Sequence, residues 1–260
     1  MKKEFVHLHV HTGFSLLDGS IKIKDLISRT KELGMDTIAI TDHGSMFGVI
    51  EFYKEAMRQN IKPILGSEIY TAINKYTEKE PKDKNQYHLV LLAEDNQGYQ
   101  NLMKIVSEAY VNGFYYKPRV DKDILRKYNK GIIALSACLG GEIQQFLLDN
   151  NYERAKQSAL EHRDIFGEGN FFLELQDHGM NEQVQVNNQL IRLSKETGIP
   201  LVATNDVHYL RKEDAGVHDV LLCIQTGKTI NDDDRMKFPT NQFYLKSPEE
   251  MIELFANQRQ

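Results

Sequence analysis

Seven short apolar segments recur along the chain, and helical patterns separate most of them. The first surrounds Val6, Leu8 and Val10, and the others are residues 36–41, 63–70, 88–93, 131–137, 171–175 and 200–204. Apolar residues at helical spacing fill stretches such as 21–33, 46–59, 97–111 and 182–196. Because strands buried on both faces are apolar without alternation, this order predicts an α/β fold with a mainly parallel sheet covered by helices. A closed barrel accommodates this many units best.

One connection departs from this pattern. Residues 71–87 are polar and lysine-rich and include Pro81, which makes them a poor crossover helix. We therefore expect strands 63–70 and 88–93 to pair antiparallel. The charged run at 78–84 is interpreted as a solvated loop.

The length of 260 residues suits a single large α/β barrel domain. A capped helix is predicted at 247–255, because Ser247 precedes a proline and two glutamates. That helix has nothing to lead into before residue 260. We therefore expect residues 1–260 to be one domain cut from a longer chain, with 246–260 beginning the connection to the remainder.

Charge and cysteine content limit the partners and the compartment. A formal net charge of −5 provides no basic field, so tight independent binding to nucleic acid is not expected. Two cysteines are too few for a disulfide framework, and the N-terminus lacks the apolar run of a signal peptide. No apolar stretch approaches the roughly 20 residues that span a bilayer. These features predict a cytoplasmic protein without a membrane partner.

Three histidines share one face of the first segment. With a period of two, His7, His9 and His11 point away from the apolar side. Clustered imidazoles typically serve as metal ligands, whereas a surface strand with incidental histidines is the alternative. His7 lies one layer deeper than the others and is interpreted as a core histidine.

The positions of other potential ligands favour a metal site. In α/β barrels the chemistry lies at the carboxyl ends of the strands, and potential ligands recur there in this sequence. His88 begins its strand, but antiparallel pairing returns it to the same end, beside Glu68. Asp18 is the least specific member, because an Asp-Gly pair is ordinarily a turn. The nine predicted ligands are His9, His11, Asp18, His43, Glu68, His88, Cys138, Asp206 and His208.

Nine donors exceed the capacity of one ion, so two or three divalent ions are predicted, with Glu68 available as a bridge. The mixture of imidazole, carboxylate and thiol suits Zn²⁺, Mn²⁺ or Fe²⁺ better than Mg²⁺ or Ca²⁺.

Seven motifs follow one another between residues 5 and 255: HLHVHTGFSLLDG, ITDHGSMFGVIEFY, IKPILGSEIY, GYQNLMKIVSEAY, LSACLGGEI, VATNDVHY and SPEEMIELF. In these motifs the chain resembles the polymerase and histidinol phosphatase (PHP) family, in the version that opens the catalytic alpha subunit of bacterial DNA polymerase III. The resemblance implies a distorted seven-stranded β/α barrel with a trinuclear metal centre. It also implies three sets of ligands: His9, His11, Glu68 and Asp206; Glu68, His88 and Cys138; and Asp18, His43 and His208.

The activity implied by the resemblance is 3′→5′ exonuclease proofreading, in which ion-activated water attacks a phosphodiester. Glu68, Asp206 and His208 are the predicted catalytic residues, and Lys117 and Arg119 are predicted to contact the substrate phosphate, unless they form a surface salt-bridging pair. The expected partners are a DNA primer 3′ end, the remaining polymerase domains and other replisome subunits. Two alternatives stay open, namely a small-molecule phosphomonoesterase and a metal-binding scaffold without hydrolytic activity.

Overall fold

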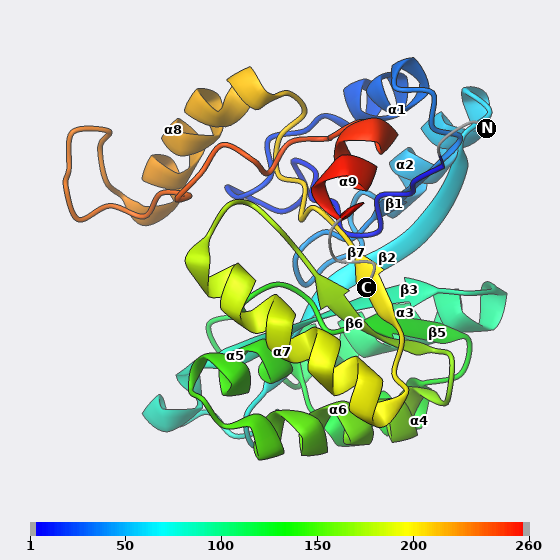
Figure 1. Cartoon of the computed structure of the whole chain (residues 1–260), viewed down its shortest axis with the longest axis vertical. Helices are drawn as coiled ribbons and strands as arrows, with labels where there is room; N and C mark the ends of the chain where they lie inside the picture. The colour runs from blue at the N-terminus through cyan, green and yellow to red at the C-terminus, as the bar shows by residue number, and fades with distance from the viewer. Residues whose placement is uncertain (1–3, 257–260) are drawn as a thin grey trace.

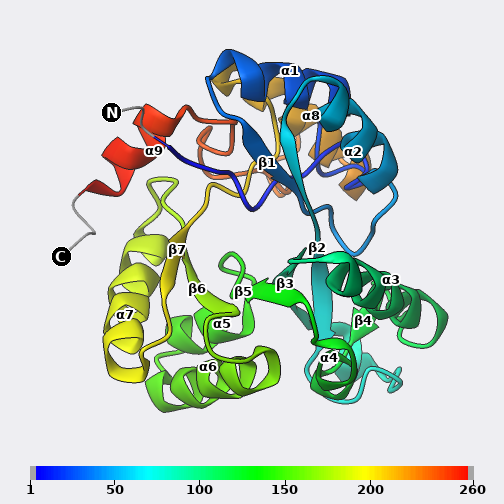
Figure 2. The same ribbon diagram turned by 90° about the vertical axis from the view of Figure 1, so that its right-hand side faces the viewer.

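A curled mixed sheet with helices on its outer side forms the molecule. The computed structural model describes residues 4–256. Six strands follow one another around the curve in Figure 2: β1 (Thr37–Ile40), β2 (Lys62–Ala72), β3 (Gln86–Ala93), β5 (Ile132–Leu135), β6 (Phe171–Leu175) and β7 (Leu201–Ala203). The short β4 (Arg119–Val120) pairs with β2 outside this order. The predicted α/β fold is confirmed.

The expected reversal of one strand is also confirmed. β3 pairs antiparallel with both β2 and β5, whereas β1–β2, β5–β6 and β6–β7 are parallel. The register sets His88 opposite Tyr70 and Val90 opposite Glu68. The polar connection between β2 and β3 contains only the short 3₁₀ helix η1 (Pro81–Lys84). The reversal therefore brings the beginning of β3 to the end of the sheet where the parallel strands finish.

The N-terminal segment is not the regular strand that the sequence predicts. Residues 7–11 are extended and lie between the two edges of the sheet. On one side Ala39 N donates to His7 O (2.9 Å), and on the other His11 N donates to Val207 O (2.7 Å). Val10 forms a single parallel bridge with Val207. Because the segment divides its hydrogen bonds between two neighbours, it forms no continuous ladder with either, yet it joins β1 to the end of β7.

Helices occupy the outer side of the sheet (Figures 1 and 2). Four were expected: α1 (Ile23–Glu32), α2 (Val49–Arg58), α3 (Asn96–Val111) and α7 (Asn181–Thr197). Another five elements were not identified from the sequence: α4 (Lys122–Tyr128), α5 (Glu142–Leu148), α6 (Tyr152–Phe166), η2 (Lys212–Asp214) and α8 (Ala215–Thr226). The main core lies between α3, α5, α6, α7 and the sheet, and a second cluster joins α1 and α2 to β1.

The predicted C-terminal helix is α9 (Pro248–Leu254). Its capping box is complete, since Glu250 N donates to Ser247 Oγ (3.2 Å) and Ser247 N donates to Glu250 Oε2 (2.7 Å). Within residues 4–256, every helix is too short or too polar to span a bilayer.

Candidate metal centre

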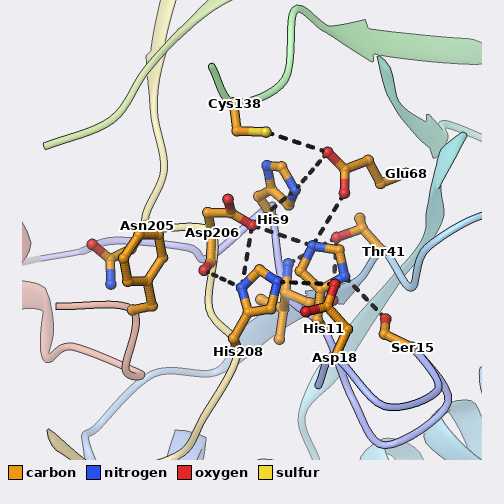
Figure 3. A network of polar contacts seen from close by, with 12 residues as sticks. His9, His11, Ser15, Asp18, Thr41, Glu68, Cys138, Asn205, Asp206 and His208 are labelled. Atoms are coloured by element: carbon orange, nitrogen blue, oxygen red, sulfur yellow. Dashed lines mark hydrogen bonds and ion pairs between the residues drawn. The ribbon is translucent and has the colours of Figure 1, made fainter. Parts of the chain in front are cut away.

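The structure brings all nine predicted ligands together at one end of the sheet. Figure 3 labels all of them except His43 and His88. His9 and His11 come from the extended N-terminal segment, and Asp18 comes from the loop that follows it. The other six lie at the corresponding ends of strands: His43 after β1, Glu68 in β2, His88 in β3, Cys138 after β5, and Asp206 and His208 after β7.

Glu68 lies at the middle of the group. Its Oε1 is 2.9 Å from His88 Nδ1, 3.4 Å from His9 Nε2 and 3.9 Å from Cys138 Sγ. Its Oε2 is 2.8 Å from His43 Nδ1 and 3.3 Å from His11 Nε2. The two oxygens of this buried carboxylate thus face different sets of donors, which is the arrangement that a bridging ligand needs.

Two further carboxylates face the imidazoles. Asp206 Oδ1 lies 3.2 Å from both His9 Nε2 and His11 Nε2. Asp18 Oδ2 lies 2.8 Å from His43 Nε2 and 3.8 Å from His208 Nε2. Asp206 has a left-handed backbone (φ 45°), a strained conformation of the kind that concentrates at functional sites.

Buried polar atoms that lack a hydrogen bond indicate whether these residues fit metal ions. Within residues 4–256, six buried ligand atoms of the group make no well-directed hydrogen bond, although oppositely charged groups lie close to several of them: His9 Nε2, His11 Nε2, Asp18 Oδ1, His43 Nδ1, Glu68 Oε2 and Asp206 Oδ1. A buried polar atom without a hydrogen bond is costly, and cations bound among these atoms would satisfy them. Imidazole, carboxylate and thiol donors are the ligands of Zn²⁺, Mn²⁺ and Fe²⁺, so the residues fit such ions.

Three groups of ligand atoms are close enough to share an ion. One, with His9, His11 and Asp206, contains three of the four ligands implied for the first ion. The other two groups, His11–His43–His208 and His43–Glu68–His88, each combine ligands from different implied sets. His43 belongs to both groups and faces both Asp18 and Glu68. Which residues share an ion stays a prediction.

Opposite charges dominate the electrostatics of the centre. Burial opposes ionisation of Glu68, but the charges of His88, His9 and His43 outweigh it and hold the Glu68 pKa well below its usual range. Burial likewise opposes protonation of His43, yet Glu68 and Asp18 raise its pKa to about 10. Without ions the carboxylates are thus balanced by protonated imidazoles, a role that divalent cations can take over.

At the Cys138 thiol, burial and the neighbouring carboxylates shift the pKa in the same direction. Burial raises the Cys138 pKa well above the usual value, and the carboxylates of Glu68 and Asp206 raise it further. The sulfur therefore remains a thiol unless a cation is bound next to it.

Three residues support the loop that carries Asp18. The Asp42 carboxylate accepts hydrogen bonds from Thr12 N (2.6 Å), Thr12 Oγ1 (2.8 Å) and Ser15 Oγ (2.7 Å). Ser15 Oγ also lies 3.0 Å from His11 Nδ1. Asp42 thus positions the loop and turns away from the metal group, although it is adjacent to His43 in sequence.

Glu174 is a residue of the site that the sequence reasoning missed. It lies within β6, is buried, and accepts a hydrogen bond from His9 Nδ1 (2.7 Å). Gln176 Nε2 (3.0 Å) and Thr204 Oγ1 donate to the same oxygen. Because His9 donates from Nδ1, its Nε2 is free to face Asp206 and Glu68. A single acid inside the apolar sequence FFLEL was the available signal.

Replacing Glu174 by glutamine is expected to weaken binding of Mn²⁺ or Zn²⁺ by about tenfold to a hundredfold, because His9 loses its charged orienting partner. Titration against a competing chelator measures the change. Glu182→Gln, at an exposed carboxylate on α7, is the matched control. Unchanged affinity in a folded Glu174→Gln chain would contradict the orienting role.

Arg119 was wrongly predicted to contact substrate. Its side chain is completely buried and donates to four backbone carbonyls: Gly113 O (3.3 Å), Asp83 O (2.5 Å), Tyr76 O (3.3 Å) and Glu78 O (2.8 Å). The guanidinium therefore fastens two loops together, and its burial keeps it out of reach of a phosphate.

Lys117 lies where a substrate contact is feasible. It lines a cavity that also includes Asp18 and His43, and its Nζ lies 5.2 Å from the centre of the Tyr70 ring. Its role in phosphate binding stays a prediction.

Comparison with known proteins identifies related sequences. The model of the PHP domain family matches residues 7–178. The DNA polymerase III subunit alpha of Borreliella burgdorferi is 50% identical over 256 residues, which cover 98% of this chain and 22% of that protein. The subunit of the same name from Thermus aquaticus is 49% identical over 255 residues, covering 96% and 21%. The chain thus spans about a fifth of the length of these curated relatives.

Two solved structures share the fold, each with a TM-score of 0.50. One is an amidohydrolase from Chromobacterium violaceum, 15% identical, covering 78% of this chain and 87% of that chain. The other is a two-domain Bacteroides vulgatus protein described as containing a predicted PHP-like metal-dependent phosphoesterase, 18% identical, covering 78% and 51%.

Proposed function

The chain belongs to the PHP domain family, and from this premise we propose that it is the PHP domain of a bacterial DNA polymerase III alpha subunit and hydrolyses phosphodiesters with divalent metal ions. We assign it 3′→5′ exonuclease activity on DNA ends delivered by the other polymerase domains, within a cytoplasmic replication complex. The observation that carries the proposal is the convergence of nine competent ligands, six of which have buried atoms that make no well-directed hydrogen bond.

The proposed mechanism assigns a role to each group. The nine ligands would hold two or three ions of Zn²⁺, Mn²⁺ or Fe²⁺, and such ions would supply Lewis acidity for acidifying water and stabilising charge on phosphoryl oxygens. Glu68 would bridge ions, since its two oxygens face different donors. Asp206 and His208 orient the attacking water, and the ammonium of Lys117 contacts the phosphate at the cavity.

Elemental analysis combined with an exonuclease assay tests this function. The purified chain is expected to hold two or three ions and to shorten single-stranded DNA from its 3′ end in Mn²⁺ or Zn²⁺. The double variant His9→Ala, His11→Ala removes two ligands and is expected to lose its bound ions and, with them, its activity. Hydrolysis that persists in the variant without bound ions would contradict the metal mechanism.

The same experiment separates the two other functions. A strong preference for a phosphomonoester such as p-nitrophenyl phosphate over DNA ends would identify a small-molecule phosphatase. Bound ions and ion-dependent melting without hydrolysis of either ester would identify a structural scaffold that docks the polymerase core or other replisome subunits.

A further inference from the structure

An aromatic cavity opens beside the candidate metal centre. Its volume is about 190 Å³, and Asp18, His43 and Lys117 form part of its lining. Six aromatic side chains form much of the rest: Phe14, Phe47, Tyr70, Tyr110, Phe114 and Tyr116. None of the six is among the ligands, so the metal centre alone does not account for their presence.

Several of these rings are exposed and lie close to one another. Phe47 is 61% exposed, Phe114 is 48% exposed and Tyr116 is 62% exposed. The ring centre of Tyr110 lies 6.0 Å from that of Phe47 and 6.2 Å from that of Phe114. Exposed aromatic rings that gather beside a functional site usually mark a binding surface.

The loop that carries two of these rings is held rigidly. Arg119 Nε donates to Gly113 O, and a side chain at position 113 would place its Cβ 1.9 Å from Arg119 O. Tyr115 N donates to Lys117 O (3.0 Å). Tyr116 has a left-handed backbone (φ 60°), which is costly for an aromatic residue and persists only where the surroundings impose it. The backbone that carries Phe114 and Tyr116 is therefore held in place before any ligand binds.

Two lysines accompany the rings. Lys117 Nζ lies 5.2 Å from the centre of the Tyr70 ring, and Lys84 Nζ lies 5.2 Å from that of Tyr116. The chain carries a net charge of −5, so cations placed among aromatic rings stand out from an acidic background. Aromatic faces with interleaved lysines match a ligand that combines flat bases with phosphates.

We propose that Phe47, Tyr110, Phe114 and Tyr116 form a stacking platform for the unpaired bases at the 3′ end of a single-stranded nucleic acid, whose terminal phosphodiester enters the cavity beside Lys117. The choice of a 3′ phosphodiester rests on the proposed function. Stacking does not depend on base identity, so the platform selects unpaired ends without reading sequence.

Fluorescence anisotropy of two labelled oligonucleotides tests the platform. One is an oligothymidylate of about eight nucleotides and the other an abasic chain of equal length. Both carry phosphorothioates at their last linkages to prevent cleavage, and both are measured with the 260-residue chain in Mn²⁺. The unmodified protein is expected to bind the oligothymidylate about tenfold more tightly than the abasic oligonucleotide.

Phe47→Ala and Phe114→Ala are each expected to weaken thymidylate binding about tenfold and to leave abasic binding unchanged. Tyr53→Ala, at a 45% exposed ring on α2 outside the cavity, is the matched control and is expected to change neither affinity. Equal affinity of the unmodified chain for both oligonucleotides, or equal losses for both in the variants, would overturn the platform.

Cleavage of an unprotected abasic oligonucleotide tests the proposed function separately. The control variant Tyr53→Ala is expected to cleave it at the rate of the unmodified chain, because Tyr53 belongs neither to the platform nor to the metal ligands. If the unmodified chain cleaves neither oligonucleotide, the proposed nuclease function fails, whereas the binding measurements still decide whether bases stack on the platform.

Discussion

Replacing Glu68 by glutamine is expected to lower phosphodiester hydrolysis by about 10³-fold or more and to reduce the number of bound ions. Each oxygen of the carboxylate faces its own set of donors, with His88, His9 and Cys138 at Oε1 and His43 and His11 at Oε2. Glutamine has the same shape but presents only one acceptor and no charge. It therefore cannot join two cations, and its amide group would face a cation at one of the two positions.

Rates on DNA and metal content should be measured together on the same preparation of Glu68→Gln. Glu142→Gln provides a control at a partly buried carboxylate on α5 that pairs with Lys122 (2.9 Å). Full metal content and a full hydrolytic rate in Glu68→Gln would show that the bridging assignment is wrong. If Glu68→Gln keeps its full metal content but loses activity, Glu68 acts in the hydrolytic step and is not needed to hold the ions.

Removing the ions is expected to lower the melting temperature of the chain by about 10 °C or more. An ion present at about a thousand times its dissociation constant stabilises the folded state by about 4 kcal/mol. For a chain of this size, each kcal/mol changes the melting temperature by about 2–4 °C. The buried ligand atoms that make no hydrogen bond add to the effect, because chelation leaves the carboxylates balanced only by protonated imidazoles.

Calorimetry with and without a chelator measures this shift. In the double variant His9→Ala, His11→Ala the melting temperature should be independent of the chelator, since two ligands are missing. An unchanged melting temperature in a chain shown to contain ions would mean that ion binding and folding are not coupled.

Periodicity predicted much of the fold, because strands buried on both faces leave a strong apolar pattern. The reversal of β3 was also predicted, from the lysine-rich connection and the position of His88. The extended N-terminal segment was misjudged because hydrogen bonds divided between two neighbours leave no mark in a sequence. The two-residue β4 and helices such as α5 and α8 depend on packing against distant elements, which a single sequence does not reveal.

The candidate site was predicted by position, since polar side chains at strand ends meet at one end of a barrel. The wrong assignment of Arg119 and the failure to identify Glu174 have the same physical origin. Arg119 follows Lys117 and Pro118 in a sequence that suggested a phosphate contact, but burial turns its guanidinium to carbonyls far away in the chain. Glu174 was overlooked because its function depends on contact with His9, which lies more than 160 residues earlier.

The pairing of Val10 with Val207 has a consequence for how the protein is made. The segment that carries His9 and His11 is synthesised first, yet its bridge partner Val207, which follows β7, is made roughly 200 residues later. At a ribosomal rate of about 5–20 residues per second, the interval between synthesis of the two histidines and synthesis of that partner is on the order of 10–40 s. Metal loading is therefore a late event of biosynthesis, and a chain whose translation stops before residue 207 cannot complete the centre.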